Sequence, residues 1–494
     1  MTYILAIDQG TTGSTCLVVA RDGRVLGRGY REITQHFPAP GWVEHDPHEI
    51  LERTCDAARE AIAQAGVIPV AAGITNQRET IVLWERATGR AIHNAIVWQD
   101  RRTAARCAEL APQADMIAER TGLVTDPYFS ASKLEWLLAR PGVRERALRG
   151  ELAAGTIDSW LIWHLTGGAV HATDHTNASR TMLYDLDRRA WSEELCALFS
   201  VPPSLLPTVQ ASGSVFGQIV PSAFGTAMPI AGVAGDQQAA LFGQGGWQAG
   251  GGKNTYGTGA FLLLNTGNAR PQRGHGLLTT IACDERGAPV YALEASIFIA
   301  GAAVQWLRDG LGLIKTAAES EALARSLASN EGVYFVPALT GLGAPDWEPN
   351  ARGTIVGLTR GTSRAHLVRA ALEAMAFGTF DVLDDMRHMG NVPFNLLRVD
   401  GGATQNDWLM QFQADVLGVP VERPDIVETT ALGAAGLAGL TVGVWANGAE
   451  FLASRTFARF TPGAGNAAAV AAHDGWRRAV RATLSWARDM STTR

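Results

Sequence analysis

Asp236 is the only charged residue between Val233 and Gly243, a stretch close to the middle of the 494-residue chain. The residues from Met228 to Val233 are apolar and few enough for a buried strand, and Gln237 to Phe242 are helix formers. Asp236 is therefore predicted at a strand-to-helix turn. Its carboxylate could cap the helix there, or act as a general base at the carboxyl end of a strand, where open α/β sheets place their ligands.

Four further side chains suit a small polar ligand with a hydrocarbon side. Arg78 and Glu79 lie in a polar run, Thr75 to Thr80, between two apolar segments. Neighbouring residues of a regular strand point to opposite faces, so both can reach one ligand only if the strand is broken; otherwise they form a surface ion pair on a hairpin. Trp98 ends an apolar segment and Tyr128 lies in a loop that contains proline, and aromatic residues at such places are commonly core.

Two loops rich in glycine and threonine could bind phosphate. The first, Gln9 to Ser14, follows a strand predicted at Tyr3 to Ile7 and precedes a hairpin, and the second lies at Thr255 to Phe261. Such loops can direct several backbone N–H groups and hydroxyls at one point, as a phosphate requires, although either alone is also an ordinary turn. The sequence contains neither a P-loop motif nor the protein-kinase motifs.

The two halves of the chain repeat an order of elements. Six glycines between Gly243 and Gly252 mark a boundary, and each half opens with a Gly/Thr loop and a hairpin. This repetition indicates a duplicated architecture in which one phosphate loop from each half faces a cleft. The second half adds a helix at Ile299 to Leu307 and a D-G-G turn at Asp400 to Gly402, which lets another molecule approach the backbone. We expect domains at residues 1–245 and 246–494.

Composition narrows the class of protein. A net charge of −6 gives no basic footprint, so nucleic acid is not an expected partner. The five cysteines are scattered and form no C-x-x-C pair, which favours reduced thiols in a cytoplasmic protein. The first residues are typical of a strand rather than of a signal peptide.

One uncharged span, Thr429 to Ala449, resembles a membrane helix. Its spaced glycines lower its hydrophobicity and suit close packing, so we expect a buried helix and no membrane insertion. His45 and His48 lie among carboxylates beside a helix expected at about Pro47 to Ala65. No second cluster supports a metal site there, and we expect a solvated loop instead.

Taken together, these segments resemble the FGGY carbohydrate kinase family. The matching runs include D-Q-G-T-T-G-S, P-G-W-V-E-H-D-P, G-I-T-N-Q-R-E-T, T-N-A-S-R-T-M-L, A-G-D-Q-Q-A-A-L-F-G-Q, K-N-T-Y-G-T-G-A-F and V-D-G-G-A, in this order over nearly the whole chain. The resemblance implies the α/β fold of sugar kinases and actin-like ATPases, with two duplicated RNase H-like domains around a cleft. It also implies phosphorylation of glycerol to sn-glycerol 3-phosphate, with ATP as co-substrate and Mg²⁺ as cofactor.

The resemblance also assigns roles to individual positions. Asp236 looks like the base that takes the proton of the glycerol hydroxyl, and Asp8 like the residue near Mg²⁺, with Asp236 also near the ion through water. The implied polyol contacts are Arg78, Glu79, Tyr128, Asp236 and Gln237, with Trp98 and Phe261 against the carbon atoms. The implied ATP contacts are Thr11, Thr12, Gly13, Thr258, Gly301, Gln305, Gly402 and Asn406.

Three departures from the family pattern bear on binding. Thr15 stands where some members carry an arginine after the first phosphate loop, which removes one positive charge near the phosphates. Phe224 to Met228 lacks the arginine with which some bacterial relatives bind fructose 1,6-bisphosphate, and Pro462 to Val470 lacks the charged segment that binds a sugar-transport regulator. We therefore expect neither regulator, and we expect a homo-oligomer, either a dimer or a tetramer.

Two alternatives stay open at this point. One is a kinase for a larger polyol such as erythritol or xylitol; a smaller residue at Trp98 or Phe261 would favour it, and neither is small. The other is a non-catalytic sensor on the same fold. The presence of Asp236 and the lack of an appended peptide-binding domain argue against the sensor.

Overall fold

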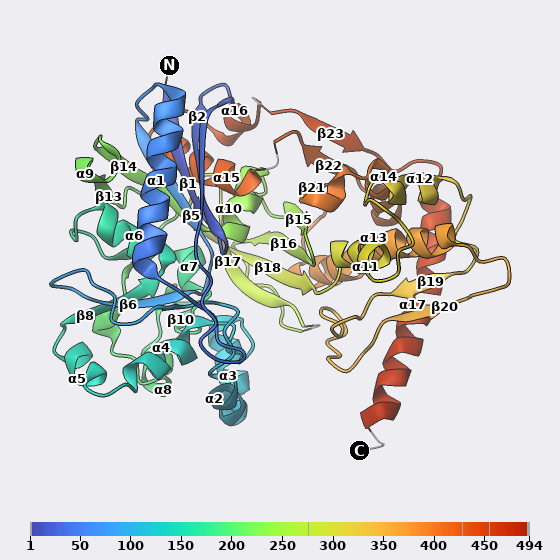
Figure 1. Cartoon of the computed structure of the whole chain (residues 1–494), viewed down its shortest axis with the longest axis horizontal. Helices are drawn as coiled ribbons and strands as arrows, with labels where there is room; N and C mark the ends of the chain where they lie inside the picture. Colours follow the sequence, from blue (N-terminus) through green and yellow to red (C-terminus); the bar gives the residue numbers. More distant parts are fainter. Residues whose placement is uncertain (1, 275, 427, 454, 492–494) are drawn as a thin grey trace.

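The computed structural model describes residues 2–274, 276–426, 428–453 and 455–491, and it folds into two similar halves, the first on the left and the second on the right of Figure 1. A six-stranded sheet in the first half has the strand order β13-β14-β5-β1-β2-β3. Its strands are β1 (Tyr3–Gln9), β2 (Gly13–Ala20), β3 (Val25–Glu32), β5 (Ala71–Asn76), β13 (Gly217–Ile219) and β14 (Met228–Gly235).

The second half is built on a seven-stranded sheet with the order β17-β18-β16-β15-β21-β22-β23. Its strands are β15 (Gly252–Tyr256), β16 (Ala260–Gly267), β17 (Leu278–Cys283), β18 (Pro289–Ile297), β21 (Leu397–Asp400), β22 (Val421–Pro424) and β23 (Phe457–Phe460). Short strands form smaller sheets elsewhere: β4 (Glu44–His45), β6 (Ile81–Glu85), β7 (Ala95–Ile96), β8 (Leu152–Thr156), β9 (Ala172–Asp174), β10 (Tyr184–Asp185), β11 (Ala190–Trp191), β12 (Thr208–Gln210), β19 (Tyr334–Val336) and β20 (Thr354–Val356).

The two large sheets share one plan. Strand β1 pairs antiparallel with β2 and parallel with β5, and β15 pairs in the same way with β16 and β21. The parallel arrangement then continues from β5 to β14 and from β21 to β22. The two Gly/Thr loops follow β1 and β15, so they occupy equivalent places. The predicted duplicated architecture is therefore confirmed.

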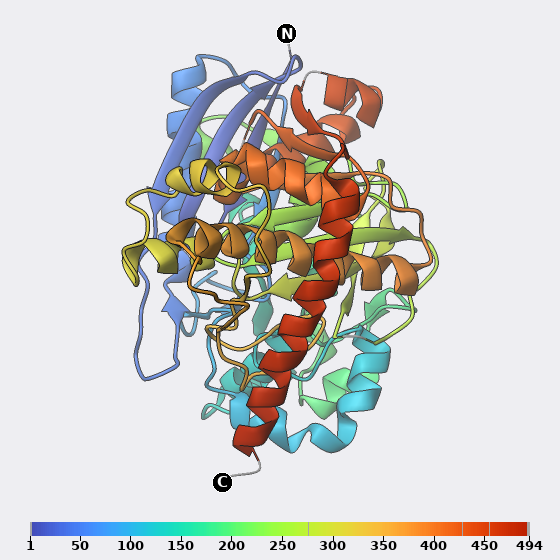
Figure 2. The same ribbon diagram turned by 90° about the vertical axis from the view of Figure 1, so that its right-hand side faces the viewer.

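Helices surround the large and the small sheets, and each half of the sequence contributes its own set (Figure 1). In the first half they are α1 (Pro47–Ala65), α2 (Ala104–Glu109), α3 (Ala114–Thr121), α4 (Ser130–Leu138), α5 (Val143–Leu148), α6 (Ile157–Leu165), α7 (His175–Ala178), α8 (Glu193–Leu198), α9 (Pro221–Phe224) and α10 (Asp236–Gly243). In the second half they are α11 (Gly301–Asp309), α12 (Glu319–Arg325), α13 (Arg364–Gly390), α14 (Asp407–Leu417), α15 (Thr429–Thr441), α16 (Gly448–Ala453) and α17 (Asn466–Ser491). Figure 2 shows α17 running along the face of the second half.

Helix α1 has the predicted bounds, and local sequence explains both ends. The Asp46 carboxylate accepts a hydrogen bond from the backbone N–H of His48, and Gly66 ends the helix in a left-handed conformation with φ 64°. The helix lies close against β3 because a Cβ atom at Gly27 or Gly29 would stand 2.0 Å from a carbonyl oxygen of α1. These glycines allow the close approach.

The apolar span Thr429 to Ala449 was predicted as a buried helix, and this is confirmed as far as Thr441, where α15 ends. The rest of the span is a partly exposed turn and the start of α16. Helix α15 belongs to the second half by sequence but packs on the sheet of the first, where a Cβ atom at Gly73 of β5 would stand 2.0 Å from the Ala434 carbonyl oxygen. Gly433 lies equally close to α10, since its Cβ would stand 1.8 Å from the Ala239 oxygen. Within the described ranges, no helix combines the length and the apolarity needed to span a bilayer.

Candidate active site

Asp236 stands at the predicted strand-to-helix turn. Strand β14 ends at Gly235, which is also the N-cap of α10, and no side chain caps this helix. The Asp236 carboxylate accepts a hydrogen bond from the N–H of Gln237 at 2.6 Å, and its side chain is 32% exposed. Asp236 is thus the first residue of α10 and not its N-cap, but its carboxylate does bind a first-turn N–H group and is also accessible.

The strand is broken at Arg78 and Glu79, as a shared ligand requires. Strand β5 ends before them, β6 begins after them, and Glu79 has φ 63°, a left-handed conformation that is uncommon for residues other than glycine. Arg78 is 3% and Glu79 1% exposed. The alternative of a surface ion pair on a hairpin is wrong, because both side chains are buried.

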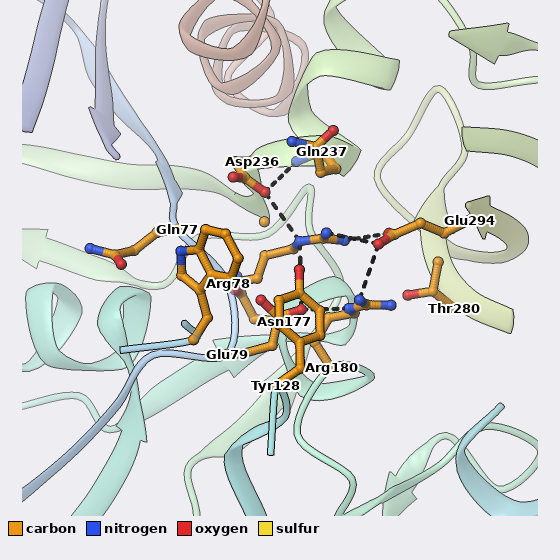
Figure 3. Close-up of polar contacts among 12 residues, drawn as sticks. Gln77, Arg78, Glu79, Tyr128, Asn177, Arg180, Asp236, Gln237, Thr280 and Glu294 are labelled. Carbon is orange, nitrogen blue, oxygen red and sulfur yellow. Dashed lines mark hydrogen bonds and ion pairs between the residues drawn. The ribbon is translucent and has the colours of Figure 1, made fainter. Parts of the chain in front are cut away.

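Arg78 and Glu79 belong to a network of four buried charged side chains (Figure 3). The Arg78 Nε atom lies 3.1 Å from an Asp236 carboxylate oxygen, and its two terminal nitrogens donate to Glu294 at 2.5 and 2.9 Å. Arg180 donates to Glu79 at 2.7 Å and to Glu294 at 3.1 Å. Asp236 thus faces a guanidinium that is fixed from behind by Glu294.

Neither Glu294 nor Arg180 was among the residues predicted for the site. Glu294 lies on β18, within the otherwise uncharged strand P-V-Y-A-L-E-A-S-I, and a carboxylate in such a strand is the signal that could have drawn attention to it. Arg180 lies in the run T-N-A-S-R-T-M-L, which carries the family resemblance but was given no role. Both side chains are fully or almost fully buried.

The charges of the network balance. Two arginines, Arg78 and Arg180, face two glutamates, Glu79 and Glu294. Burial alone would raise the pKa of Glu294, but the adjoining Arg180 and Arg78 guanidinium groups outweigh burial and hold this pKa at about 2. Burial raises the pKa of Glu79, against the opposing effect of the same two arginines. The network also joins the two halves, because Glu294 lies on the second sheet while its partners belong to the first half.

Trp98 and Tyr128 form one wall of the same region. Their rings meet edge to face, with centroids 5.4 Å apart and an interplanar angle of 89°. Both are half-buried, so each keeps an exposed surface. The Trp98 indole nitrogen donates to the Thr11 hydroxyl at 2.9 Å, which brings this wall next to the first Gly/Thr loop.

Gln237 contacts the second sheet on the face that carries Phe261. The Gln237 side-chain oxygen accepts from the buried Lys253 ammonium at 2.5 Å, and Lys253 also donates to the Thr255 hydroxyl at 2.8 Å. Phe261 pairs with Thr255 across the sheet, and Lys253 pairs with Leu263. Because side chains alternate along strands, Phe261 and Lys253 lie on one face of the sheet. That face also carries Glu294, which pairs with Leu263.

The first Gly/Thr loop directs N–H groups outward. All four carbonyl oxygens from Gly10 to Gly13 accept hydrogen bonds from the protein. The donors are the side chains of Gln9, Gln35 and Gln77 and the backbone N–H groups of Ile33 and Gly10, at 2.8 to 3.3 Å. The C=O and N–H of a trans peptide point in opposite directions, so the N–H groups of Thr11 and Thr12 face away from these donors. No described residue accepts from them, which leaves them available to an anion.

The second Gly/Thr loop rests on the start of α11. The Thr258 carbonyl oxygen accepts from the N–H groups of Ala300 and Ala302 at 2.8 and 3.1 Å, and the Gly257 oxygen accepts from Gly301 at 3.0 Å. A Cβ at Gly301 would stand 2.6 Å from that Gly257 oxygen, so glycine allows this contact. Thr258 itself is exposed.

A cavity of about 440 Å³ opens beside the second loop. Such a volume is typical of small-molecule and cofactor sites. Its lining includes Gly301 and Gln305 of α11, together with Gly402 and Asn406 from the segment after β21. The structure thus brings together four residues for which the family resemblance implies contacts with the nucleotide, although they come from segments about 100 positions apart.

Replacing Gly402 should block this cavity without unfolding the protein. A Cβ atom there would have no neighbour within 4 Å, so Gly402→Leu is expected to fold while its side chain fills the cavity. We expect the Kd for ADP, measured by calorimetry, to rise by at least about tenfold. Gly361→Leu, at an exposed position outside the cavity, is the control and should bind ADP normally. Unchanged ADP affinity in Gly402→Leu would place the nucleotide elsewhere.

Asp8 lies near the end of β1, next to the first Gly/Thr loop, and the charge of Asp236 acts on its carboxyl group. Burial of its carboxyl, together with the nearby charge of Asp236, raises the pKa of Asp8 to about 7. A buried carboxyl group beside a second carboxylate suits a hard divalent cation, and Mg²⁺ is commonly held by one or two carboxylates plus substrate phosphates. The residues present therefore fit the ion that the family resemblance implies.

Asp8→Asn should stabilise the metal-free protein in a pH-dependent way. The pKa of Asp8 is about 7 in the folded protein, whereas an unfolded aspartate titrates near about 3.9, so the wild-type protein loses stability as pH rises between these values. We expect the variant to melt roughly 1–3 °C above wild type at pH 8 with a chelator present, and the gap to shrink toward pH 4. A gap that does not change with pH would contradict the raised pKa.

The burial of His45 differs from what the sequence predicts. A solvated loop was expected there, but the His45 side chain is fully buried and contacts Gln35 and Gln77. His48 is exposed, as expected for a solvated loop, and its ring packs edge to face on Trp160. The five cysteines are buried and unpaired.

Comparison with known proteins shows to which family the chain belongs. Family models match its residues 3–243 and 252–442, and they describe the N-terminal and C-terminal domains of the FGGY family of carbohydrate kinases. The chain belongs to this FGGY family. The matched segments end and begin on either side of the glycine-rich stretch between α10 and β15.

Individual FGGY proteins are similar over almost their whole length. A glycerol kinase of Aromatoleum aromaticum is 58% identical over 98% of this chain and 99% of its own, and one of Methylibium petroleiphilum is 57% identical over 98% and 100%. The crystal structure of Plasmodium falciparum glycerol kinase with ADP superposes with a TM-score of 0.93 at 37% identity, covering 98% of each chain. The two-domain sugar kinase fold is therefore confirmed for this FGGY protein.

Proposed function

We propose that this FGGY kinase transfers the γ-phosphoryl group of ATP to glycerol and forms sn-glycerol 3-phosphate. The observation that carries the proposal is the accessible Asp236 carboxylate, held 3.1 Å from the buried Arg78 guanidinium at the start of α10. Relatives named glycerol kinases at 57–58% identity support the choice of substrate, and a relative solved with ADP supports the nucleotide.

The acceptor region offers polar groups for hydroxyls and apolar surface for carbon atoms. Arg78, Glu79, Tyr128 and Gln237 would bind the hydroxyls, while Trp98 and Phe261 would lie against the carbon chain. A small ligand gains at most about 1.5 kcal/mol of binding free energy per non-hydrogen atom. Because glycerol has few atoms, almost every hydroxyl must find a partner. An analogue that lacks a hydroxyl would leave a buried charged group of the site unpaired, and the site would therefore bind this analogue more weakly than glycerol.

Asp236 would act as the general base. In phosphoryl transfer the protein mainly aligns the groups and stabilises charge, and a carboxylate within hydrogen-bond reach of the attacking hydroxyl takes its proton. The N–H groups of Thr11 and Thr12 in the first loop, and the exposed Thr258 in the second, would bind the phosphates, and the cavity beside α11 would hold the adenosine. Mg²⁺, held by Asp8 and Asp236 through water, would neutralise phosphate charge when bound with ATP.

ADP release with Mg-ATP tests this proposal against a set of acceptors: glycerol, dihydroxyacetone, erythritol, xylitol and none. We expect kcat/KM to be highest with glycerol, because two large rings, Trp98 and Tyr128, form one wall of the acceptor region and leave less room for a longer polyol than small side chains would. Highest activity with erythritol or xylitol would contradict the substrate assignment. ADP release that no acceptor raises above the blank would contradict kinase activity altogether.

A further inference from the structure

The buried His45 lies in a closed circuit of hydrogen bonds beneath the first phosphate loop. One arm runs from His45 Nε2 to the Gln35 side-chain oxygen at 2.8 Å, and from the Gln35 amide nitrogen to the Thr11 carbonyl oxygen at 2.9 Å. The other arm runs from His45 Nδ1 to the Gln77 amide nitrogen at 3.4 Å. His45 therefore sits between the loop and the residue that precedes Arg78.

The circuit closes through Trp98. The Thr80 hydroxyl donates to the Gln77 side-chain oxygen at 2.9 Å and accepts from the backbone N–H of Trp98 at 3.2 Å. The Trp98 indole then donates to the Thr11 hydroxyl at 2.9 Å. One ring of hydrogen bonds thus passes through Trp98 of the acceptor wall and Thr11 of the phosphate loop, with His45 opposite them.

The donors and acceptors of this ring fix the tautomer of His45. The Gln35 amide nitrogen donates to Thr11, so its side-chain oxygen faces His45 and accepts the proton carried by Nε2. This leaves Nδ1 as an acceptor facing the Gln77 amide nitrogen, which also donates to the Gln9 side-chain oxygen at 3.0 Å and the Gly10 carbonyl oxygen at 3.3 Å. If the imidazole were protonated, its Nδ1–H group and the Gln77 amide nitrogen would be two donors facing each other. Burial lowers the pKa of His45 to about 4, so the ring is neutral at ordinary pH, as this arrangement needs.

We infer that His45 is a positioning residue that sets the first phosphate loop and couples nucleotide binding to polyol binding through this ring. The inference rests on the proposed function, because it assigns the loop to ATP and the Trp98 wall to glycerol. His45 touches neither ligand. It acts by fixing the Thr11 carbonyl, which aims the N–H of Thr12 at the phosphates, and by fixing Gln77 and Thr80 behind Trp98.

Direct binding tests the inference apart from activity. Turnover of glycerol by the wild-type protein is measured first, and its absence would refute the proposed function. Calorimetry then gives the Kd for ADP and the Kd for glycerol with and without ADP. For His45→Ala we expect the ADP Kd to rise about fivefold to thirtyfold, since two hydrogen bonds are lost. ADP should strengthen glycerol binding at least about threefold in the wild-type protein and less in this variant.

Two conservative variants separate the arms of the ring. A glutamine side chain can place a donor near the Nε2 position, whereas an asparagine side chain reaches only the Nδ1 position. His45→Gln is therefore expected to restore ADP affinity to within about threefold of wild type. His45→Asn is expected to bind ADP as weakly as His45→Ala, because it restores only the contact to Gln77.

His171→Ala is the control for the loss of a histidine; its side chain is half-buried, whereas that of His45 is fully buried. His171 also lies in the first half and its pKa is likewise lowered to about 4 by burial, but it bonds the Ala154 carbonyl and packs on Trp84, outside the circuit. It should lower the melting temperature without changing the ADP Kd. If His45→Ala lowers the melting temperature in the same way while the ADP Kd and the effect of ADP on glycerol stay at wild-type values, the inference is wrong.

Discussion

Asp236→Asn is expected to lower kcat with glycerol by about 10²- to 10⁴-fold, the usual contribution of a general base. The asparagine amide keeps the shape of the carboxylate but cannot take the proton of the attacking hydroxyl. Arg78 would stay in place, because its two terminal nitrogens are bound by Glu294 at 2.5 and 2.9 Å. Glycerol should therefore bind within about tenfold of its wild-type affinity, so the loss falls on kcat rather than on binding.

The matched control is Asp115→Asn. Asp115 is fully exposed and lies 4.0 Å from Arg273, so its replacement should leave kcat and melting temperature unchanged. Steady-state kinetics and glycerol calorimetry on both variants check the prediction. A kcat near the wild-type value in Asp236→Asn would overturn the assignment of the base.

Glu294→Ala is expected to cost about 3–5 kcal/mol of unfolding free energy, because removing one partner leaves an uncompensated buried charge. Here a single carboxylate serves both Arg78 and Arg180, and each side chain involved is at least 98% buried. The same change frees Arg78 from its anchor, so we also expect weaker glycerol binding. Equilibrium denaturation and glycerol calorimetry measure the two effects.

The control for this loss is Glu60→Ala. Glu60 also pairs with an arginine, Arg31, but both side chains are more than one third exposed, and such surface pairs contribute about 0–1 kcal/mol. Glu294→Gln, which keeps one acceptor oxygen, should fall between wild type and Glu294→Ala. Equal stability losses in Glu294→Ala and Glu60→Ala would show that the buried network is not a main support of the site.

The sequence predicts the local elements of the site well. Asp236 is found at the end of β14 because an apolar strand and a run of helix formers meet there, and α1 begins and ends at the predicted residues because its capping residues are local signals. For Arg78 and Glu79 the sequence leaves open a strand break or a surface ion pair on a hairpin, and the structure has the break. Each of these features depends on a few neighbouring residues.

Other features depend on partners far along the chain. Arg78 and Glu294 are 216 positions apart, and no local pattern links an arginine in a loop to a glutamate in a distant strand. His45 was expected in solvent because its neighbours are polar, but the segments carrying Gln35 and Gln77 enclose it. The glycines of α15 predict close packing, yet they do not say that the helix covers the sheet of the other half. Tertiary packing decides all three.

The most direct test of the account is the identity of the product formed from glycerol and Mg-ATP. Glycerol has two equivalent primary hydroxyls, and a site that fixes each hydroxyl by a different side chain should phosphorylate only one of them. We expect one ADP for each phosphorylated glycerol, with all the product being the sn-3-phosphate enantiomer in a chiral assay. ADP without glycerol phosphate, or a mixture of both enantiomers, would contradict the account.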